Sequence, residues 1–217
     1  MEKAKRGPYA LFIKRLLDIM LSMLFIIGFC WLYAIIAILV KVKLGSPVLF
    51  KQERPGKIDP KTGKEKIFAM YKFRSMTNEK DADGNLLPDE QRMNDFSRWI
   101  RRTSCDELPE LFNIVKGDMS IIGPRPLLVR YLDRYNEEQQ HRHDVRPGLT
   151  GYAQAHGRNA LSWEEKFKMD VWYIQHVTFK TDIGIFFATI KIVLEREGIS
   201  SDTSATMEEF MGNEVSK

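Results

Sequence analysis

The stretch Ile19–Val40, "IMLSMLFIIGFCWLYAIIAILV", contains no charged residue. A run of about twenty apolar residues is what a helix needs to cross the hydrocarbon core of a bilayer. A cleaved signal peptide has a shorter apolar run, of roughly 7–15 residues, and ends in a small-residue cleavage site. No such site follows Val40. We therefore expect a membrane-associated helix at this end of the chain.

Basic residues flank this apolar stretch on both sides: Lys3, Lys5, Arg6, Lys14 and Arg15 before it, and Lys41, Lys43, Lys51 and Arg54 after it. Lys and Arg mark the cytoplasmic side of a membrane, so a helix that enters and turns back would keep both flanks inside. A bend needs its backbone hydrogen bonds satisfied away from water. Gly28 is the only central residue with weak helix propensity, and no proline stands nearby. From the residues alone, re-entrant and spanning helices remain equally open.

The composition of the whole chain suits one domain of moderate size with an appendage, because 217 residues carry 44% hydrophobic content. We divide it into a membrane helix at 1–43, a compact domain at 44–200 and an irregular tail at 201–217. The net charge of +4 and pI near 9.0 fit a membrane surface, a phosphorylated metabolite or nucleic acid. Cys30 and Cys105 have no disulfide or zinc-site spacing, which favours a reducing compartment.

Two segments after the apolar stretch read as short strands with basic residues interleaved: "SPVLFKQERPG" and "KEKIFAMYKFRSM". The turn-rich "KIDPKTG" joins them, so we expect a β-hairpin. Near the end of the chain, "TDIGIFFATIKIVLERE" has a broad apolar helical stripe, which would pack on a core or rest on a bilayer surface. The expected fold class is therefore α+β, mostly helical, with a short hairpin or sheet.

Two adjacent carboxylates, Asp106 and Glu107, stand within "RRTSCDELPELFNIVKGDMSIIGPRP", which runs from Arg101 to Pro126. A helix starting just after Asp106 would place Pro109 near its third position, where proline is tolerated, and would make Asp106 its N-cap. The same location has a chemical meaning. A helix N-terminus and nearby arginines favour an ionised carboxylate and attract phosphate oxygens. Asp106 is thus a possible nucleophile toward phosphorus.

Several arginines stand in loops stiffened by proline or glycine. Arg125 lies between two prolines in "GPRP", Arg146 precedes Pro147, and Arg158 follows Gly157, ahead of the capping box that Ser162 begins. A rigidly held guanidinium fork suits phosphate, although an ordinary proline-rich turn is the alternative at "GPRP". The candidate phosphate-binding residues are Arg101, Arg125, Arg146, Arg158 and Lys72.

The motifs of this chain, from Phe12 onward, resemble those of the bacterial sugar transferase family, the monotopic phosphoglycosyl transferases. They stand in the family's order: "KRLLDIM", "ERPG", "MYKFRSM", "RRTSCDELPELFNIVKGDMSIIGPRP", "HRHDVRPGLTGYAQAHGRNALSWEEKF" and "DVWY". The length is similar to that of the family's small forms, typified by the bacillosamine-phosphate transferase of bacterial N-linked glycosylation.

This resemblance implies transfer of a phosphosugar from a UDP-sugar to a polyprenyl (undecaprenyl) phosphate, with release of UMP and a requirement for Mg²⁺. It implies that Asp106 is the nucleophile of a covalent phosphosugar intermediate, that Glu107 is its partner, and that both can serve the metal. It also implies a re-entrant membrane helix and a small catalytic domain at the cytoplasmic face of the bacterial inner membrane. The reaction would open glycoconjugate assembly, with downstream glycosyltransferases as further partners.

Two departures from the family pattern stand out. The Ser-Pro pair that is usual at the break of the re-entrant helix aligns with Cys30 and Trp31. Cys105 replaces the usual Leu before the Asp106–Glu107 pair, which we call the dyad. Two other functions compete with the transferase. A phosphohydrolase would use the same carboxylates and substrates. A non-catalytic basic domain would leave the dyad unexplained, and a carboxylate pair would repel a nucleic-acid backbone, so we expect no nucleic-acid partner.

Overall fold

The computed structural model describes residues 7–157, 161–195 and 209–213. The apolar stretch forms two helices, α1 (Lys14–Gly28) and α2 (Cys30–Leu44), after a π-helical turn at Tyr9–Ile13. They meet at Phe29, whose φ of −115° and ψ of 23° lie outside the helical region. The break thus follows Gly28 directly and occurs without a proline.

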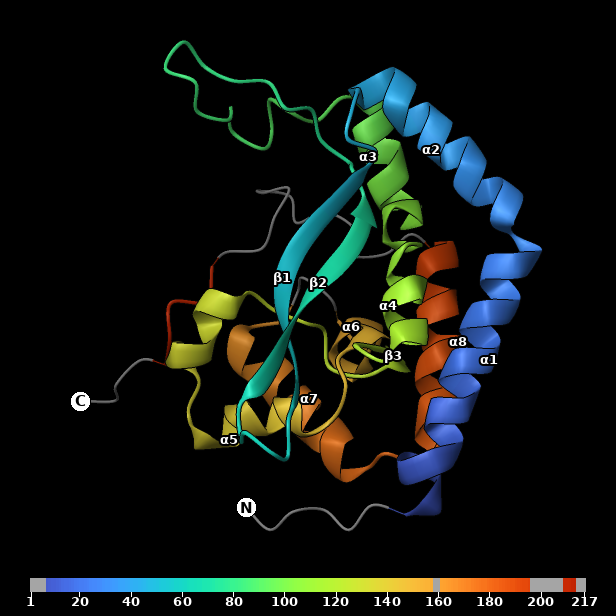
Figure 1. Ribbon diagram of the computed structural model, residues 1–217. Helices are drawn as coiled ribbons and strands as arrows, with labels where there is room; N and C mark the ends of the chain where they lie inside the picture. Colours follow the sequence, from blue (N-terminus) through green and yellow to red (C-terminus); the bar gives the residue numbers. More distant parts are fainter. Residues whose placement is uncertain (1–6, 158–160, 196–208, 214–217) are drawn as a thin grey trace.

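No single helix in the described ranges is both long and apolar enough to cross a bilayer. The segments Tyr9–Gly28 and Cys30–Leu44 meet that requirement only as a pair, and the pair is bent by 66°. Figure 1 shows the two helices as an arc along one side of the molecule, with the bend farthest from the hairpin and both outer ends returning to the body.

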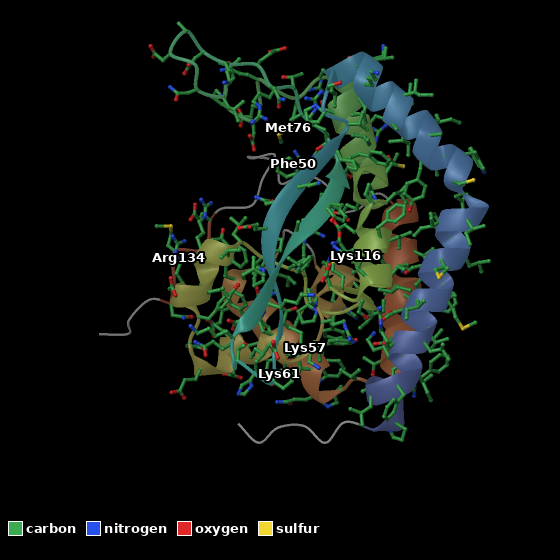
Figure 2. All side chains as sticks on the ribbon, viewed as in Figure 1. Phe50, Lys57, Lys61, Met76, Lys116 and Arg134 are labelled. Carbon is green, nitrogen blue, oxygen red and sulfur yellow. The ribbon has the colours of Figure 1, made fainter. Side chains whose placement is uncertain are left out.

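The outer surface of this arc is apolar, and its side chains project away from the rest of the protein (Figure 2). Its most exposed large apolar residues, all more than half exposed, are Leu16, Met20, Leu21, Leu24, Ile27, Trp31, Ile38 and Val42. Exposing this much apolar surface to water is unfavourable. A large apolar patch of this kind marks a protein or membrane contact.

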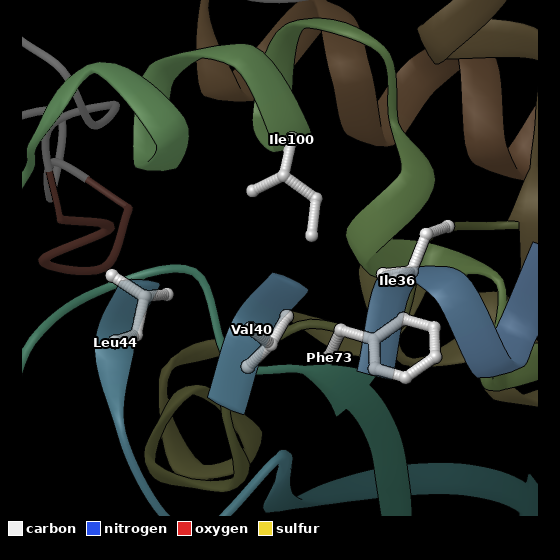
Figure 3. Packing of buried hydrophobic residues seen from close by; sticks show 5 residues of the cluster. All are labelled: Ile36, Val40, Leu44, Phe73 and Ile100. Carbon is white, nitrogen blue, oxygen red and sulfur yellow. The ribbon is translucent and has the colours of Figure 1, made fainter. Parts of the chain in front are cut away.

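The inner face of α2 anchors the arc to the domain. Ile36, Val40 and Leu44 follow one another at four-residue spacing and are all buried. Together with Phe73 from the hairpin and Ile100 from α3 (Asp95–Arg102), they form one hydrophobic cluster (Figure 3). Each such side chain contributes about 1.5–3 kcal/mol when fully buried. The same helix therefore carries a core face and an exposed apolar face.

The predicted hairpin is confirmed. β1 (Leu49–Ile58) pairs antiparallel with β2 (Glu65–Phe73), with Leu49 opposite Phe73 and an irregularity between Pro55 and Ile58. Asn113 of α4 (Glu110–Lys116) fixes the hairpin to the helices: its side chain accepts from the Tyr71 amide at 3.0 Å and donates to the Ala69 carbonyl at 2.8 Å. A second, smaller pair is parallel and joins β3 (Ser120–Ile122) to β4 (Gly148–Thr150).

The predicted cap at Asp106 is wrong. Asp106 lies inside a 3-10 turn, Cys105–Glu107, and α4 begins three residues after Glu107, with Pro109 at its N-cap position and no side-chain cap. The chain reverses at Ser104, whose φ of 54° is left-handed, and its carbonyl then accepts from the Glu107 amide at 3.1 Å. The turn therefore occupies the residues that the predicted helix start required.

The remaining elements are mostly helical: 3-10 turns Val129–Arg134 and His141–Asp144, and helices α5 (Glu137–Gln140), α6 (Tyr152–Ala155), α7 (Trp163–Gln175) and α8 (Phe179–Glu195). Ser162 forms the predicted capping box with Glu165. The described part of the tail, 209–213, contains no helix or strand, and its Phe210 is buried against Tyr131, Tyr135 and Phe167.

Helix α8 lies beside α1 (Figure 1), and Lys14 pairs with Asp182 at 2.6 Å. Its Ile185 is buried in the cluster around Tyr173, while Ile183, Phe186, Phe187 and Ile190 stay exposed. Ile185 thus packs on the core, whereas Ile183, Phe186, Phe187 and Ile190 do not, and contact of these exposed residues with a bilayer surface stays a prediction.

Candidate active site

The carboxylates of Asp106 and Glu107 lie where three parts of the chain converge. The 3-10 turn presents them just before α4, β2 contributes Lys72, and the loop after β3 contributes Arg125. Asp106 is buried, with 8% of its surface exposed. The structure therefore brings together four residues that the sequence predicted as site residues.

Glu107 is the centre of the ion pairs. Lys72 Nζ lies 2.7 Å from its Oε1, and Arg125 Nη2 lies 2.6 Å from the same oxygen. Burial alone would raise the pKa of Glu107, but the charges of Arg125 and Lys72 outweigh it and hold that pKa well below its usual range. Glu107 is therefore ionised at every physiological pH.

Asp106 has the opposite electrostatic environment. Burial, and then the neighbouring Glu107 charge, raise the pKa of Asp106 to about 6, against the opposing effects of Lys72, Arg101 and Arg125. The pKa of Asp106 is thus raised while that of Glu107 is lowered. At pH 7 Asp106 is mostly an ionised, poorly solvated carboxylate, which is the state that suits a nucleophile.

Glu110 is a third carboxylate at this site, which the sequence prediction missed. Its side chain is buried, and Lys72 Nζ lies 3.1 Å from its Oε1. Burial, and then the charge of Glu107, raise the pKa of Glu110 to about 7. The available signal was its position three residues after Glu107, which places the two on the same side of a helical turn.

Arg54, on β1, was also not predicted as a site residue. It lines a cavity of about 70 Å³ together with Lys72, Glu110 and Arg125. Burial, and then the charge of Arg125, lower the pKa of Arg54 to about 10. The basic residues that alternate along β1 were visible in the sequence, but their alternation did not show which one faces the dyad.

The rigidity expected of Arg125 has a structural basis. Arg142 donates from Nη2 to the Arg125 carbonyl at 2.8 Å and to Asp170 Oδ2 at 2.7 Å. Its Nη1 also donates to the Tyr135 hydroxyl at 3.2 Å. A fully buried arginine thus holds the loop whose side chain reaches Glu107.

The other predicted phosphate-binding residues lie in different places. Arg101, in the last turn of α3, contributes to the field that lowers the pKa of Asp106, and its Nη1 donates to Met93 Sδ at 3.3 Å. Arg146 donates from Nε to the Gly117 carbonyl at 2.9 Å, just past the end of α4 that is farther from the dyad. Arg158 lies outside the described residues.

The described residues include no cluster of three or more His, Cys, Asp or Glu side chains with metal-binding geometry. Magnesium does not need one, because it is usually held by one or two carboxylates together with substrate phosphates and water. Asp106 and Glu107 are adjacent hard oxygen donors, and burial together with the Glu107 charge disfavours the ionised form of Asp106, an effect that a bound cation would offset. The donor set therefore fits Mg²⁺ bound jointly with a substrate.

Comparison with known proteins gives one consistent result. The model of the family described as "Bacterial sugar transferase" matches residues 9–196. The chain is 52% identical over 174 residues to the uncharacterized sugar transferase EpsL of Bacillus subtilis, covering 80% of this chain and 83% of that protein.

Two further relatives are each 36% identical to the chain. One is the undecaprenyl-phosphate galactose phosphotransferase of Salmonella typhimurium, where the match covers 86% of this chain and 41% of the relative. The other is the UDP-N-acetylgalactosamine-undecaprenyl-phosphate N-acetylgalactosaminephosphotransferase of Aeromonas hydrophila, with 87% and 45% covered. The chain thus spans less than half the length of these two relatives. Because the family model covers most of the sequence, the chain belongs to the bacterial sugar transferase family.

Proposed function

We propose that this protein transfers a phosphosugar from a UDP-sugar to undecaprenyl phosphate, giving undecaprenyl-diphosphate-sugar and UMP. The observation that carries the proposal is the buried Asp106 carboxylate beside the Glu107–Lys72–Arg125 cluster. The Salmonella and Aeromonas relatives are both named for undecaprenyl phosphate, and the Aeromonas relative also for a UDP-sugar, which supports this acceptor and donor class.

The first half of the reaction uses Asp106 as the nucleophile. An Asp106 oxygen attacks the phosphorus that bears the sugar, the bond from this phosphorus to the bridging oxygen breaks, and UMP leaves with the electron pair. Lys72 and Arg125 lie where they can neutralise charge on the phosphate oxygens. The raised pKa of Asp106 makes its carboxylate more basic than that of an exposed aspartate, which favours attack.

The second half returns the enzyme to its starting state. A phosphate oxygen of undecaprenyl phosphate attacks the same phosphorus, the bond to Asp106 breaks, and the aspartate leaves as a carboxylate. Splitting the transfer in this way lets two bulky substrates use one site in turn. Asp106 and Glu107 would hold Mg²⁺ with the substrate phosphates, and the ion would supply charge neutralisation on the pyrophosphate. Glu107 also keeps Lys72 and Arg125 in place.

We place the enzyme on the cytoplasmic face of the bacterial inner membrane, with the bent α1–α2 pair inserted as a re-entrant helix. The exposed apolar surface of the pair, its 66° bend and the return of both ends to the domain support this arrangement (Figure 1). Downstream glycosyltransferases that extend the lipid-linked sugar are the expected further partners.

Intact-protein mass spectrometry tests the covalent step. The purified protein is mixed with Mg²⁺ and a panel of UDP-sugars that includes UDP-galactose and UDP-N-acetylgalactosamine. We expect a mass increase of one phosphosugar, lost in Asp106→Asn because the neutral amide lacks the attacking anion. The matched control is Cys105→Ala, which removes the neighbouring thiol and should keep the adduct.

Two results would contradict the proposal. An adduct that persists in Asp106→Asn and disappears in Cys105→Ala would assign the nucleophile to the thiol. Steady release of UMP at the same rate with and without undecaprenyl phosphate would make the protein a phosphohydrolase instead of a transferase.

A further inference from the structure

The cavity beside the Asp106–Glu107 dyad is lined by three cations, one carboxylate and three apolar residues. Arg54, Lys72 and Arg125 face a volume of about 70 Å³ that they share with one carboxylate, Glu110. The rest of the lining is apolar: Met70, Pro126 and Leu127. Because Lys72 and Arg125 also contact Glu107, the cavity lies directly beside the Asp106–Glu107 dyad.

Arg54 differs from the other two cations of this cavity. Lys72 and Arg125 are both neutralised by Glu107, whereas Arg54 forms no ion pair with any described residue. Its Nη2 donates to Gln52 Oε1 at 2.6 Å and its Nη1 to the Pro126 carbonyl at 3.3 Å, which are both neutral acceptors. Its Nε is buried and has no hydrogen-bond partner in the part of the chain that the structure describes.

An arginine in this state is prepared to receive an anion. A partly buried charge without an ion-pair partner is unfavourable, although the charge of Glu110 offsets part of this cost, and a buried N–H without an acceptor adds to it. The lowered pKa of Arg54 reports the same imbalance, because burial and the charge of Arg125 both act against its positive charge. A phosphate would supply the missing charge and also an acceptor for a guanidinium fork.

The chemistry of two successive displacements indicates which substrate phosphate would bind Arg54. In phosphoryl transfer the attacking and leaving oxygens lie roughly in line through the phosphorus. When Asp106 attacks, the phosphate of departing UMP must therefore lie opposite Asp106. When undecaprenyl phosphate attacks the covalent intermediate, Asp106 is the leaving group, so the acceptor phosphate must occupy the place that UMP has left.

We propose that the Arg54 cavity is a single phosphate subsite, occupied first by the phosphate of UMP and then by the phosphate of the lipid acceptor. This inference rests on the proposed function. Asp106 does not line the cavity, whereas the residues that pair with Glu107 do. The cavity therefore lies beside the reacting phosphorus, where the phosphate that is not transferred is needed.

Two kinetic measurements test the subsite. Exchange of labelled UMP into UDP-sugar, in the absence of acceptor, reports the KM for UMP in the first half-reaction. The full reaction at saturating UDP-sugar reports the KM for undecaprenyl phosphate. We expect Arg54→Gln to raise both KM values by a similar factor of about 10–100, the range for a lost charge-assisted hydrogen bond.

Two further variants serve as controls. Arg54→Lys keeps the charge but loses the fork, so both KM values should rise by less, and this variant carries the test if Arg54→Gln does not fold. Arg98→Gln removes an exposed arginine from α3 and should change neither KM. Thermal melts of all the variants show whether any KM change follows a loss of structure.

The outcomes separate the two proposals. Unchanged KM values in both Arg54 variants, or a rise for UMP alone or for the lipid alone, would overturn the shared subsite while leaving the transferase intact. A wild-type protein that neither exchanges UMP nor releases it would instead refute the proposed function.

Discussion

At the scale of single residues, the site gives two adjacent carboxylates very different pKa values. Glu107 shares one oxygen between two cations and stays ionised, while Asp106 has a pKa raised to about 6 by burial and by that same Glu107 charge. The sequence predicted this pair because it stands beside arginines at an expected helix start and within a motif that resembles the family's. It could not predict Glu110 or Arg54, because their roles depend on how β1, β2 and α4 pack.

The raised pKa of Asp106 predicts how the stability of the protein depends on pH, which measurements can test. The pKa is 3.8 unfolded and about 6 folded, so the native state binds the extra proton, and stability falls as pH rises from about 4 to 6. Above pH 6 the ionised Asp106 would destabilise the fold by up to about 3 kcal/mol. Asp106→Asn removes this penalty. Its melting temperature should exceed that of the wild type by a margin that grows between pH 4.5 and 6.5 and then levels off, while activity is lost.

Thermal melts of both proteins across this pH range make the comparison. Asp133→Asn, at an exposed position, should melt like the wild type at every pH and serves as the control. An Asp106→Asn protein whose stability relative to the wild type did not change with pH would show that Asp106 has an ordinary pKa.

At the scale of elements, the hairpin was predictable and the helix boundaries were less so. Alternating polar and apolar residues and a turn-rich connection define β1 and β2 locally. The start of α4 was mispredicted because Ser104 adopts a left-handed conformation that no residue type in the segment required. The break at Phe29 lies next to the glycine noted in the sequence, but its angle depends on how α2 packs on the domain.

The two faces of α2 should respond differently to the same substitution. Ile36 is buried against the domain, whereas Ile38 is 62% exposed. Ile36→Ala should destabilise the protein by about 2–5 kcal/mol through lost burial and a cavity. Ile38→Ala should leave the melting temperature in nanodiscs nearly unchanged. Equal destabilisation by both would mean that α2 does not dock on Phe73 and Ile100 as described.

At the scale of the whole molecule, one helical arc connects the catalytic domain to its proposed membrane. The buried side of the arc packs on the hairpin and α3, and exposed apolar side chains lie on the other side of the arc and on α8. The sequence established the apolar character of Ile19–Val40 and left its path open between spanning and re-entry. The path depends on a long-range arrangement, namely that both ends of the arc contact the same domain.

This arrangement makes a prediction about topology. Lys14 near the start of the arc pairs with Asp182 of α8, and Leu44 at its end packs in the cluster of Phe73 and Ile100. Because one domain holds both ends, Gly7 and Lys51 should lie on the same side of the membrane, which the basic flanks predict to be cytoplasmic. A helix that spans the bilayer would have to pull one of these contacts apart.

Cysteine labelling in sealed cells measures this topology. Single cysteines are placed at Gly7 and at Lys51, both exposed, in a protein whose own Cys30 and Cys105 are replaced by alanine. Neither site should react with a membrane-impermeant reagent until the cells are opened, and then both should react. Labelling of one site from outside while the other stays protected would show that the segment spans the membrane. That result would contradict the re-entrant helix without touching the chemistry assigned to Asp106.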